Sequence, residues 1–591
     1  AADVPMCEFW RAGFGFNTTF SLIEATSAAH IKAQPVVPAE SFTALSDGWD
    51  LYPGLLKNQT DWALAAGVNR LMFHTFVHQC FPDSVKPGMT MGGIGVQWNR
   101  NQTWWEMSKA YHDYLSRSQF LLQQGHTVSD ILYLCPEGNP HVFKAPTSAY
   151  SKPDSAYDVL YIHADETFER RPASENQDIN ILPDKKGYAF DACPPSLLYT
   201  AIVKNGQIVF PGGAEYRLLV LPNWETMTPE MLKKIKELVM DGATIVGIPP
   251  EKSPSLQNYP QCDNEVKTLV EDIWGKEGMP ATVGKRAVGK GQVIWGQDLI
   301  KNQDNSYPAY DCIAGLLSEM DIPEDFISNG CLRYTHRTKN GCDIYFVSNR
   351  SGKPVQTDCI FRVDNRIPEL WDALTGEIRE LKSFSADNGQ TTVPMQFDTD
   401  QSFFVVFRKD SNGVPSSGEN NFPLFTTVQI LDRPWSVSFE PSMGGPGKVM
   451  FEKLTDWSTN ENDSIRYYSG IGIYSQTFDM RKTSGKQFYL DLGEVNVIAK
   501  VWLNGKEVGT VWTYPWQLDI SKYVKPGENQ LKIEVVNPWV NRLIGDKIFS
   551  DKGMGKLYTK TTYQPYNATS PLVKSGLLGP VRILEVVKEV L

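Results

Sequence analysis

Segments typical of β-strands and of α-helices alternate along the first 125 residues. The expected strands and helices occupy, in chain order, residues 4–10, 34–40, 49–67, 68–76 and 101–125. The two helical segments, 49–67 and 101–125, end in Gly67 and Gly125, as helices often do. Repeated strand-then-helix order favours a parallel sheet. A complete (β/α)8 barrel needs about 250 residues, so residues 1–125 are expected to form the C-terminal half of one, with the chain beginning inside a domain.

The next region, residues 126–325, alternates in the same way and is expected to be a doubly wound α/β domain. Short apolar strands are expected at 129–135, 156–165 and 216–223. Residues 228–248 predict a helix that begins at the N-cap Thr228 and ends at Gly242, followed by a strand. Neither GxGxxG nor GxxxxGK[ST] accompanies these segments, so a nucleotide site is not expected.

The remaining sequence has the character of β-sandwiches. Residues 326–425 contain short strands and turns, and a linker rich in Ser, Gly and Asn follows at 410–421. Residues 426–591 are expected to form a jelly-roll domain of the galactose-binding, carbohydrate-binding type, with a hairpin turn at Asn504-Gly505. The expected fold class is therefore multidomain: half a barrel, a doubly wound domain, a small β-sandwich and a jelly roll.

Composition excludes several classes of partner and site. The net charge of −11 supplies no basic stripe for nucleic acid. The sequence contains no run of about 18 consecutive apolar residues, so no membrane-spanning helix is expected. The nine cysteines are scattered and never spaced as CxxC, which argues against a zinc site or a disulfide framework.

Two glutamates, Glu8 and Glu40, close the first two expected strands beside aromatic residues, and His74 closes the third. The carboxyl ends of parallel barrel strands meet in one pocket, so these three side chains are expected to lie close together. Paired carboxylates suit glycosidic cleavage, because one protonates the leaving oxygen while the other activates water or attacks the sugar. The alternative is that both glutamates are loop carboxylates with no role.

Four further residues are candidates for sugar binding: Trp10, His74, His78 and Trp98. His74 and His78 lie four residues apart, but the segment has the pattern of a strand and loop, which favours substrate hydrogen bonding over a metal pair. Trp98 follows a Gly-rich segment and is expected against a sugar face; the alternative is that this segment is a surface loop with Trp104 and Trp105 in the core. Trp502 and Trp512 are expected in the core of the last sandwich, whereas Trp516 could lie in that core or at a sugar-contacting rim.

These motifs resemble glycoside hydrolase family 106, the α-L-rhamnosidases. The resemblance rests on "DVPMCEFW", "VVPAESFTA", "NRLMFHTFVHQ" and "RYYSGIGIYSQTF", in this order along the chain. It implies an inverting hydrolysis on a (β/α)8 barrel, with a calcium ion at the sugar site. It also implies that Glu40 is the general base and that Glu8 belongs to the active centre as a calcium ligand. The general acid of the family belongs to an earlier strand, so this chain is expected to be incomplete unless a separate chain supplies that part.

Two alternatives remain beside a rhamnosidase acting on plant-type glycans or rhamnosides. One is a retaining β-galactosidase-like hydrolase, which shares a barrel followed by an α/β domain. The other is a non-catalytic glycan-binding protein in which the jelly roll binds the ligand. A periplasmic or secreted location is expected, and no leader is visible in the sequence to test it.

Overall fold

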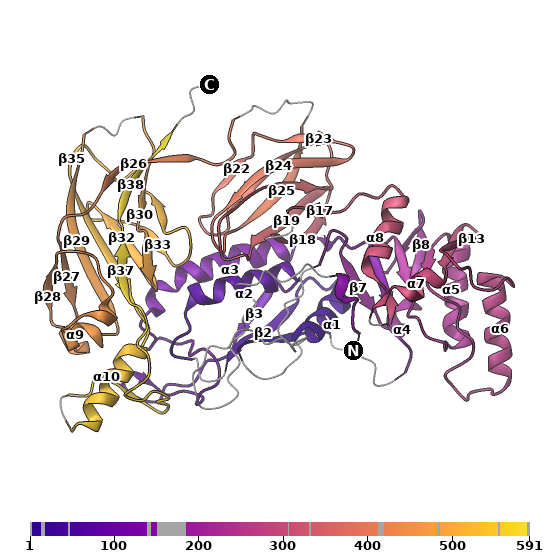
Figure 1. The fold of residues 1–591 in the computed structure, drawn as a ribbon, viewed down its shortest axis with the longest axis horizontal. Helices are drawn as coiled ribbons and strands as arrows, with labels where there is room; N and C mark the ends of the chain where they lie inside the picture. The colour runs from indigo at the N-terminus through magenta and orange to yellow at the C-terminus, as the bar shows by residue number, and fades with distance from the viewer. Residues whose placement is uncertain are drawn as a thin grey trace.

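The computed structural model describes residues 3–12, 18–44, 48–138, 143–149, 185–304, 306–329, 332–411, 419–481, 485–553 and 556–587. Figure 1 shows an α/β region at one end, a β-sandwich in the middle and a second β-sandwich at the other end. The N-terminal strands and helices lie below the middle sandwich and between the two outer regions. The expected strand at 156–165 lies outside the described residues.

The N-terminal region is a small parallel sheet covered by helices. Its elements are β1 (Cys7–Ala12), α1 (Thr18–Ile31), β2 (Pro38–Ala44), α2 (Pro53–Ala65), β3 (Arg70–Phe73), η1 (Trp105–Met107) and α3 (Lys109–Leu122). The strands pair in the order β1-β2-β3, all parallel, which confirms the predicted strand-then-helix alternation. Cys7, Ala39 and Leu71 stand in register and are buried in one core with residues of α1 and α2. A half-barrel over residues 1–125 stays a prediction.

The α/β region contains a six-stranded sheet with helices on both faces. The strands, in spatial order, are β13 (Gly284–Val288), β14 (Gly291–Trp295), β12 (Thr244–Val246), β11 (Leu218–Val220), β6 (Ile131–Leu134) and β7 (Phe190–Cys193). All neighbours are parallel except β13 and β14. Leu132 and Tyr133 are adjacent in β6 and enter two different cores, one shared with α5 (Pro229–Asp241) and one with α8 (Tyr310–Glu319). Alternate side chains therefore point to opposite, helix-covered faces, as a doubly wound sheet requires.

Helix α5 begins and ends as the sequence predicts. Thr228 is its N-cap and accepts a hydrogen bond from Met231 N at 3.3 Å, and Gly242 follows the last turn at a φ of 125°. The other helices and small strands of this region are α4 (Pro195–Leu198), α6 (Gln261–Trp274), α7 (Gln297–Lys301), β8 (Ile202–Lys204), β9 (Gln207–Val209), β10 (Glu215–Tyr216), β15 (Gln303–Asp304) and β16 (Tyr307–Pro308), with η2 (Thr147–Ala149) before them.

Two sheets form the middle sandwich. One contains β17 (Phe326–Ile327), β20 (Val355–Phe361), β24 (Gln390–Phe397) and β23 (Ser385–Asp387). The other contains β22 (Ile378–Glu380), β21 (Arg366–Trp371), β25 (Ser402–Asp410), β19 (Cys342–Asn349), β18 (Leu332–Lys339) and β5 (His126–Thr127). Strand β5 lies at the beginning of the region expected to be α/β, whereas the other strands of this sheet follow that region in the sequence. The sheet therefore combines segments from before and after the α/β region.

The last sandwich also has a four-stranded and a six-stranded sheet. The first contains β26 (Leu424–Ile430), β38 (Arg582–Val587), β30 (Phe488–Asp491) and β34 (Gln517–Asp519). The second contains β28 (Lys448–Phe451), β27 (Trp435–Phe439), β29 (Ile471–Met480), β35 (Gly527–Val536), β32 (Ile498–Leu503) and β33 (Lys506–Val511). The remaining elements are η3 (Pro441–Met443), η4 (Trp457–Thr459), α9 (Asp463–Arg466), β31 (Glu494–Asn496), α10 (Val540–Asp551), β36 (Lys560–Thr561) and β37 (Gly576–Gly579).

The Asn504-Gly505 turn joins β32 and β33 as predicted, with positive φ at both residues. Trp512 is 1% exposed, but its ring packs against Tyr111 and Tyr114 of α3 in the core of the first region, so its expected place in the core of the last sandwich is wrong. Trp516 is buried in the core of the last sandwich. Trp502 is different: it is half-buried, and the ammonium of Lys532 lies 3.7 Å from its ring centroid. Its expected core position is wrong, because the neighbours Val501 and Leu503 take the inward positions of the strand.

Helices α2 and α3 are joined to the middle sandwich by a buried ion pair. The side chains of Lys57 and Asp61 are 2% and 1% exposed and bond to each other. Lys57 Nζ also donates to the Asp400 carbonyl at 3.0 Å and to Ser402 Oγ at 3.1 Å, and the hydroxyl of Tyr114 in α3 donates to Asp61. The N-terminal region and the middle sandwich therefore share one buried core and are not separated by a solvated interface.

Replacing Asp61 with Ala is expected to lower the free energy of unfolding by about 3–5 kcal/mol, because Lys57 stays buried without its carboxylate. Lys109 and Asp113 form an ion pair of the same spacing on α3, but their side chains are 79% and 42% exposed. Asp113→Ala is the matched control and is expected to cost less than about 1 kcal/mol. Urea denaturation of both variants measures the difference, and equal losses would contradict the buried-pair assignment.

Candidate active site

The parallel register of the first sheet brings Glu8 and Glu40 side by side. Glu8 in β1 pairs with Glu40 in β2, and Glu40 pairs with Met72 in β3. Residues in register on parallel neighbours point to the same face, and the residues one position earlier are those buried against α1 and α2. The two carboxylates therefore lie on the face away from the helices, where both are half-buried and Met72 is 47% exposed.

The glutamates lie inside their strands, which corrects the expectation that each stands at a strand end. Glu8 is the second residue of six in β1, and Glu40 is the third of seven in β2. The strands continue because "FWRA" and "SFTA" follow the glutamates, and these aromatic, small and β-branched residues pack readily in a sheet. The register between the two strands shifts after Phe9 and again after Trp10, so the pairing is irregular just beyond the carboxylates.

Phe42 has a strained backbone next to this site. Its φ is 66°, in the left-handed region that bulky residues rarely adopt, at a cost of order 1–3 kcal/mol. Its fully buried ring packs edge-on against Phe9, 5.2 Å between centroids, and stacks against Phe73 at 6.0 Å. The core therefore holds the strand in this conformation, two residues beyond Glu40. No sequence signal indicates it, because Gly, Asn and Asp are the residues expected at such positions.

Each carboxylate accepts a hydrogen bond from a neighbour in its own strand. The indole N–H of Trp10 donates to Glu8 Oε1, and Gln59 in α2 donates to the Trp10 carbonyl at 2.8 Å. Thr43, which is 2% exposed, donates its hydroxyl to Glu40 Oε1 at 3.2 Å. Trp10, expected to bind sugar, thus orients Glu8, and Thr43 is a site residue that the sequence reading missed. The spacing E-x-x-T gives no distinctive signal for it.

His74 follows β3 directly and extends its ladder. Its backbone N–H donates to the Ser41 carbonyl at 3.0 Å, and alternation along the chain places its side chain on the face of Met72 and Glu40. His78 lies four residues further on in an exposed loop. Because this segment is not helical, the two imidazoles do not share a helix face, as the sequence predicted.

The expected sugar contact of Trp98 is wrong. Its side chain is 5% exposed, and its ring stacks on Phe73 at 4.2 Å between centroids and an angle of 4°. Trp104 packs edge-on against the same indole, whose N–H lies 3.4 Å from His112 Nε2. The indole is a core residue, because the aromatic side chains around it leave no open face for a sugar.

The residues that the structure describes contain no group of three or more His, Cys, Asp and Glu that could hold a metal ion. Glu8 and Glu40 supply carboxylate oxygens, the type of ligand that calcium prefers, but calcium takes six to eight oxygens. The donor chemistry of the pair therefore fits calcium, whereas two carboxylates do not complete its coordination. Within the same ranges, no helix is long and apolar enough to cross a membrane.

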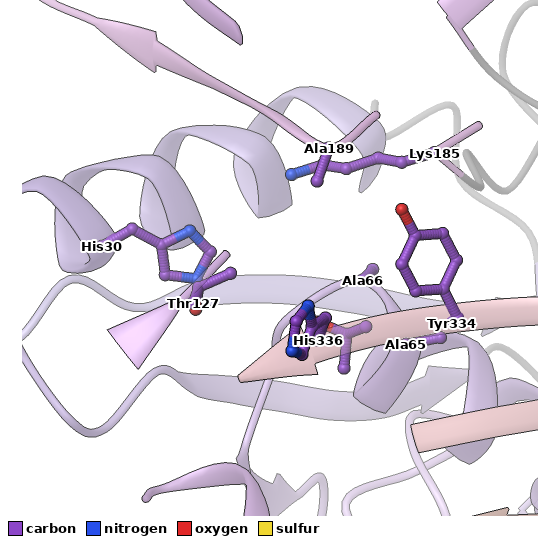
Figure 2. A pocket seen from close by; sticks show the side chains of 9 residues that line it. His30, Ala65, Ala66, Thr127, Lys185, Ala189, Tyr334 and His336 are labelled. Carbon is purple, nitrogen blue, oxygen red and sulfur yellow. The ribbon is translucent and has the colours of Figure 1, made fainter. Parts of the chain in front are cut away.

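A separate cavity lies where the N-terminal, α/β and middle sandwich regions meet (Figure 2). It is lined by His30, Ala65, Ala66, Thr127, Lys185, Ala189, Tyr334, Thr335 and His336. None of the candidate catalytic residues lines it. His30 Nδ1 lies 2.9 Å from Asp191 Oδ1, and His336 bonds to Asp325 at 2.9 Å and to Asp343 at 3.1 Å. The His30–Asp191 pair joins the N-terminal and α/β regions, whereas the bonds of His336 tie β18 to β19 and to the residue before β17. These pairs indicate a structural role.

His336, on the wall of this cavity, leads us to expect a loss of folding stability at alkaline pH. Burial alone would lower the pKa of His336, but the charges and hydrogen bonds of Asp325 and Asp343 outweigh it and raise the pKa to about 9. Below the unfolded-state pKa of about 6.5, the imidazolium stabilises the folded state by its full contribution of about 3 kcal/mol. This contribution is lost as the pH rises through 9.

Unfolding free energies of wild type and His336→Gln, measured between pH 6 and pH 10, test this expectation. The wild type should lose more stability than the variant over this range. His126→Gln, at an exposed histidine of the neighbouring strand β5, is the control and should follow the wild type. Parallel curves for His336→Gln and wild type would contradict the assignment.

Comparison with known proteins defines the class and then the family. The chain matches the model of the α-L-rhamnosidases of glycoside hydrolase family 106 over residues 1–185 and 154–386. Residues 453–549 match a galactose-binding-like domain of glycoside hydrolase family 2. Both matches are to glycoside hydrolases. Because the first extends over more than half of the 591 residues, the chain belongs to the α-L-rhamnosidase family, glycoside hydrolase family 106.

A solved structure and a curated protein resemble the chain over nearly its whole length. The rhamnosidase from Novosphingobium sp. PP1Y superimposes with a TM-score of 0.82 at 31% identity, covering 99% of this chain and 51% of its own. A protein of Formosa agariphila named putative β-glucuronidase is 26% identical, covering 98% of this chain and 65% of its own length. The chain thus spans about half of the solved rhamnosidase and less than two thirds of the curated relative.

Proposed function

We propose that the chain is part of an α-L-rhamnosidase that removes terminal α-L-rhamnosyl residues from plant-type glycans or rhamnosides with inversion of configuration. The observation that carries the proposal is the in-register pair Glu8 and Glu40, on one open face beside His74, in a chain of the α-L-rhamnosidase family. The match to the Novosphingobium rhamnosidase supports the same substrate class.

Glu40 is the general base of the proposed reaction. The hydroxyl of Thr43 occupies Oε1, so Oε2 is available to accept a proton from the attacking water. That water adds to the anomeric carbon as the glycosidic bond breaks, and an acid gives its proton to the leaving oxygen. His74, on the same face, is placed to hydrogen-bond a sugar hydroxyl. The exposed His78 is a second proposed sugar contact, at the outer edge of the site.

The general acid is a residue other than Glu8. Neighbouring strands lie about 4.7–4.9 Å apart, whereas the two carboxyl groups of an inverting enzyme are about 6.5–9.5 Å apart to admit a water. The in-register neighbours Glu8 and Glu40 therefore suit a base and a substrate or ion ligand better than a base and an acid. We propose that the acid comes from residues outside this sequence, in a further part of the same protein or in a separate chain.

Glu8 is the proposed calcium ligand of this chain. Its Oε1 accepts the Trp10 indole N–H, which fixes the carboxylate and leaves Oε2 for an ion. Calcium bound there would supply a positive charge to which two hydroxyls of the sugar ring could bind. Trp10 and Gln59 hold Glu8 in place whether or not an ion is present, because their contacts lie within this chain.

Hydrolysis by the full-length protein tests the proposal. 4-Nitrophenyl α-L-rhamnoside should be cleaved, and proton NMR should show the β-anomer of rhamnose forming first. 4-Nitrophenyl β-glucuronide is the comparison substrate, because a relative is named putative β-glucuronidase. Cleavage of the glucuronide alone would overturn the substrate, first release of the α-anomer would indicate a retaining hydrolase, and sugar binding without cleavage of either would indicate a glycan-binding protein.

We also propose a periplasmic or secreted location, because plant-type glycans are too large to cross a cell membrane without prior cleavage. Cell fractionation followed by immunodetection of the native protein tests this, and recovery in the cytoplasmic fraction alone would contradict it.

A further inference from the structure

The C-terminal region reaches across to the loop that carries His74 and His78. Strand β36 (Lys560–Thr561) pairs in parallel with β4 (Pro87–Gly88), although more than 400 residues separate them in the sequence. Lys560 N donates to the Lys86 carbonyl at 2.7 Å, and Thr562 N to the Gly88 carbonyl at 3.2 Å. The loop between β3 and η1 is thus built into a sheet with the C-terminal chain.

Side chains reinforce this pairing. Thr90 N donates to Thr562 Oγ1 at 3.0 Å, and the indole N–H of Trp49 donates to the Tyr563 carbonyl at 3.2 Å. Trp49 also belongs to a buried cluster with residues of α10 and Tyr566, against which Tyr563 packs. Trp49 lies in the connection between β2 and α2, so the C-terminal chain contacts the segments that follow both β2 and β3.

The contacts lead from Tyr563 to the imidazole of His74. Gly93 packs so closely on Tyr563 that a Cβ there would lie 2.5 Å from the phenol oxygen. Two residues on, a Cβ on Gly95 would lie 2.4 Å from His74 Nδ1. Backbone hydrogen bonds close this segment onto the strand end, with Val96 N donating to the His74 carbonyl at 2.9 Å and Thr75 N to the Val96 carbonyl at 2.8 Å.

Packing, rather than a hydrogen bond, fixes the His74 ring on this side. Among the described residues, the buried Nδ1 of His74 has no hydrogen-bond partner. The backbone of Gly95 lies against this nitrogen, and Gly95 follows Gly93 on a short segment that the phenol of Tyr563 contacts. A shift of that segment would therefore move or release the ring.

We propose that Tyr563 is a positioning residue for His74, so that the C-terminal sandwich region contributes to the geometry of the active site. The mechanistic half of this inference rests on the proposed function of His74. The structural half, from Tyr563 through Gly93 and Gly95 to the imidazole, does not.

The structural half is tested on this chain by NMR with 13C-labelled histidine. The eight histidines give few resonances, and His74→Gln identifies the one from His74. Tyr563→Ala should move that resonance and leave that of the exposed His126 unchanged. Tyr514→Ala, at a 40% exposed tyrosine of the same sandwich, is the control and should move neither. An unmoved His74 resonance in folded Tyr563→Ala would overturn the proposal.

A second variant keeps the test valid if Tyr563→Ala folds poorly. Gly93→Ala should shift the His74 resonance, because its Cβ would press on the phenol. In the double variant, Gly93→Ala with Tyr563→Ala, the phenol is absent. The methyl group added at position 93 should therefore shift the His74 resonance less than it does in Gly93→Ala alone. Equal effects of Gly93→Ala in both backgrounds would show that Tyr563 is not the contact that matters.

Kinetics of the full-length protein test the mechanistic half. Tyr563→Ala should lower kcat on an aryl α-L-rhamnoside about tenfold, because a small misplacement of a substrate-binding group is costly, with Tyr563→Phe close to wild type. Unchanged kcat would overturn the role in catalysis. A wild type without rhamnosidase activity would refute the proposed function, and the NMR result would still decide the positioning of His74.

Discussion

Replacing Glu40 with Gln in the full-length protein is expected to lower kcat on an aryl α-L-rhamnoside by roughly 10²–10⁴ and to leave the fold intact. The amide has the shape of the carboxylate, so the hydrogen bond from Thr43 can be kept by the side-chain oxygen. What is lost is the group that accepts a proton from the attacking water. KM should change little, because the amide still occupies the same volume in the site.

Glu106→Gln is the matched control for this prediction. Glu106 lies in η1 of the same region and is exposed, so the substitution changes the charge by the same amount away from the site. Circular dichroism and thermal unfolding should show both variants folded. A kcat for Glu40→Gln within about threefold of wild type would show that Glu40 is not the base.

Removal of the proposed calcium ion is expected to lower activity strongly, and added calcium should restore it. Loss of an ion that holds and polarises a substrate removes several kcal/mol of stabilisation, so kcat/KM should fall roughly 10²–10³-fold. Glu8→Ala should have the same effect without a chelator. Zinc should restore little, because it prefers nitrogen and sulfur ligands in a smaller coordination shell.

Trp10→Phe separates the ion from the group that orients its ligand. The ring remains, but the indole N–H to Glu8 Oε1 is lost, so calcium affinity should fall less than in Glu8→Ala. Calorimetric titration with calcium measures the affinity independently of activity. Full activity after exhaustive chelation, with no calcium found by elemental analysis, would exclude a catalytic ion.

Local signals in the sequence predicted the features that depend on a few neighbouring residues. Thr228 and Gly242 mark the two ends of α5 because an N-cap hydroxyl and a glycine of positive φ act within one helical turn. Asn504-Gly505 marks the hairpin because both residues tolerate positive φ. The parallel pairing of β1, β2 and β3 followed from the repeated order of strand and helix.

Burial of individual aromatic residues depended on partners that are distant in the sequence. Trp98 is in the core because Phe73 covers one face of its ring and Trp104 and Tyr111 pack around it. Trp502 faces outward because its strand presents alternate residues to the interior. A tryptophan beside glycines, or one in an alternating strand, has the same local sequence pattern whether its side chain is buried in the core or lies at the surface.

The sequence alone predicted that Glu8 and Glu40 belong to neighbouring parallel strands, because consecutive strands joined by a helical crossover usually lie side by side. Only the tertiary structure decided that they stand in register on one face, inside their strands, with Trp10 and Thr43 on their oxygens. It also decided that Tyr563 lies against the loop of His74. The reason is physical: local preferences act over a few residues, whereas register and docking minimise the free energy of a whole interior.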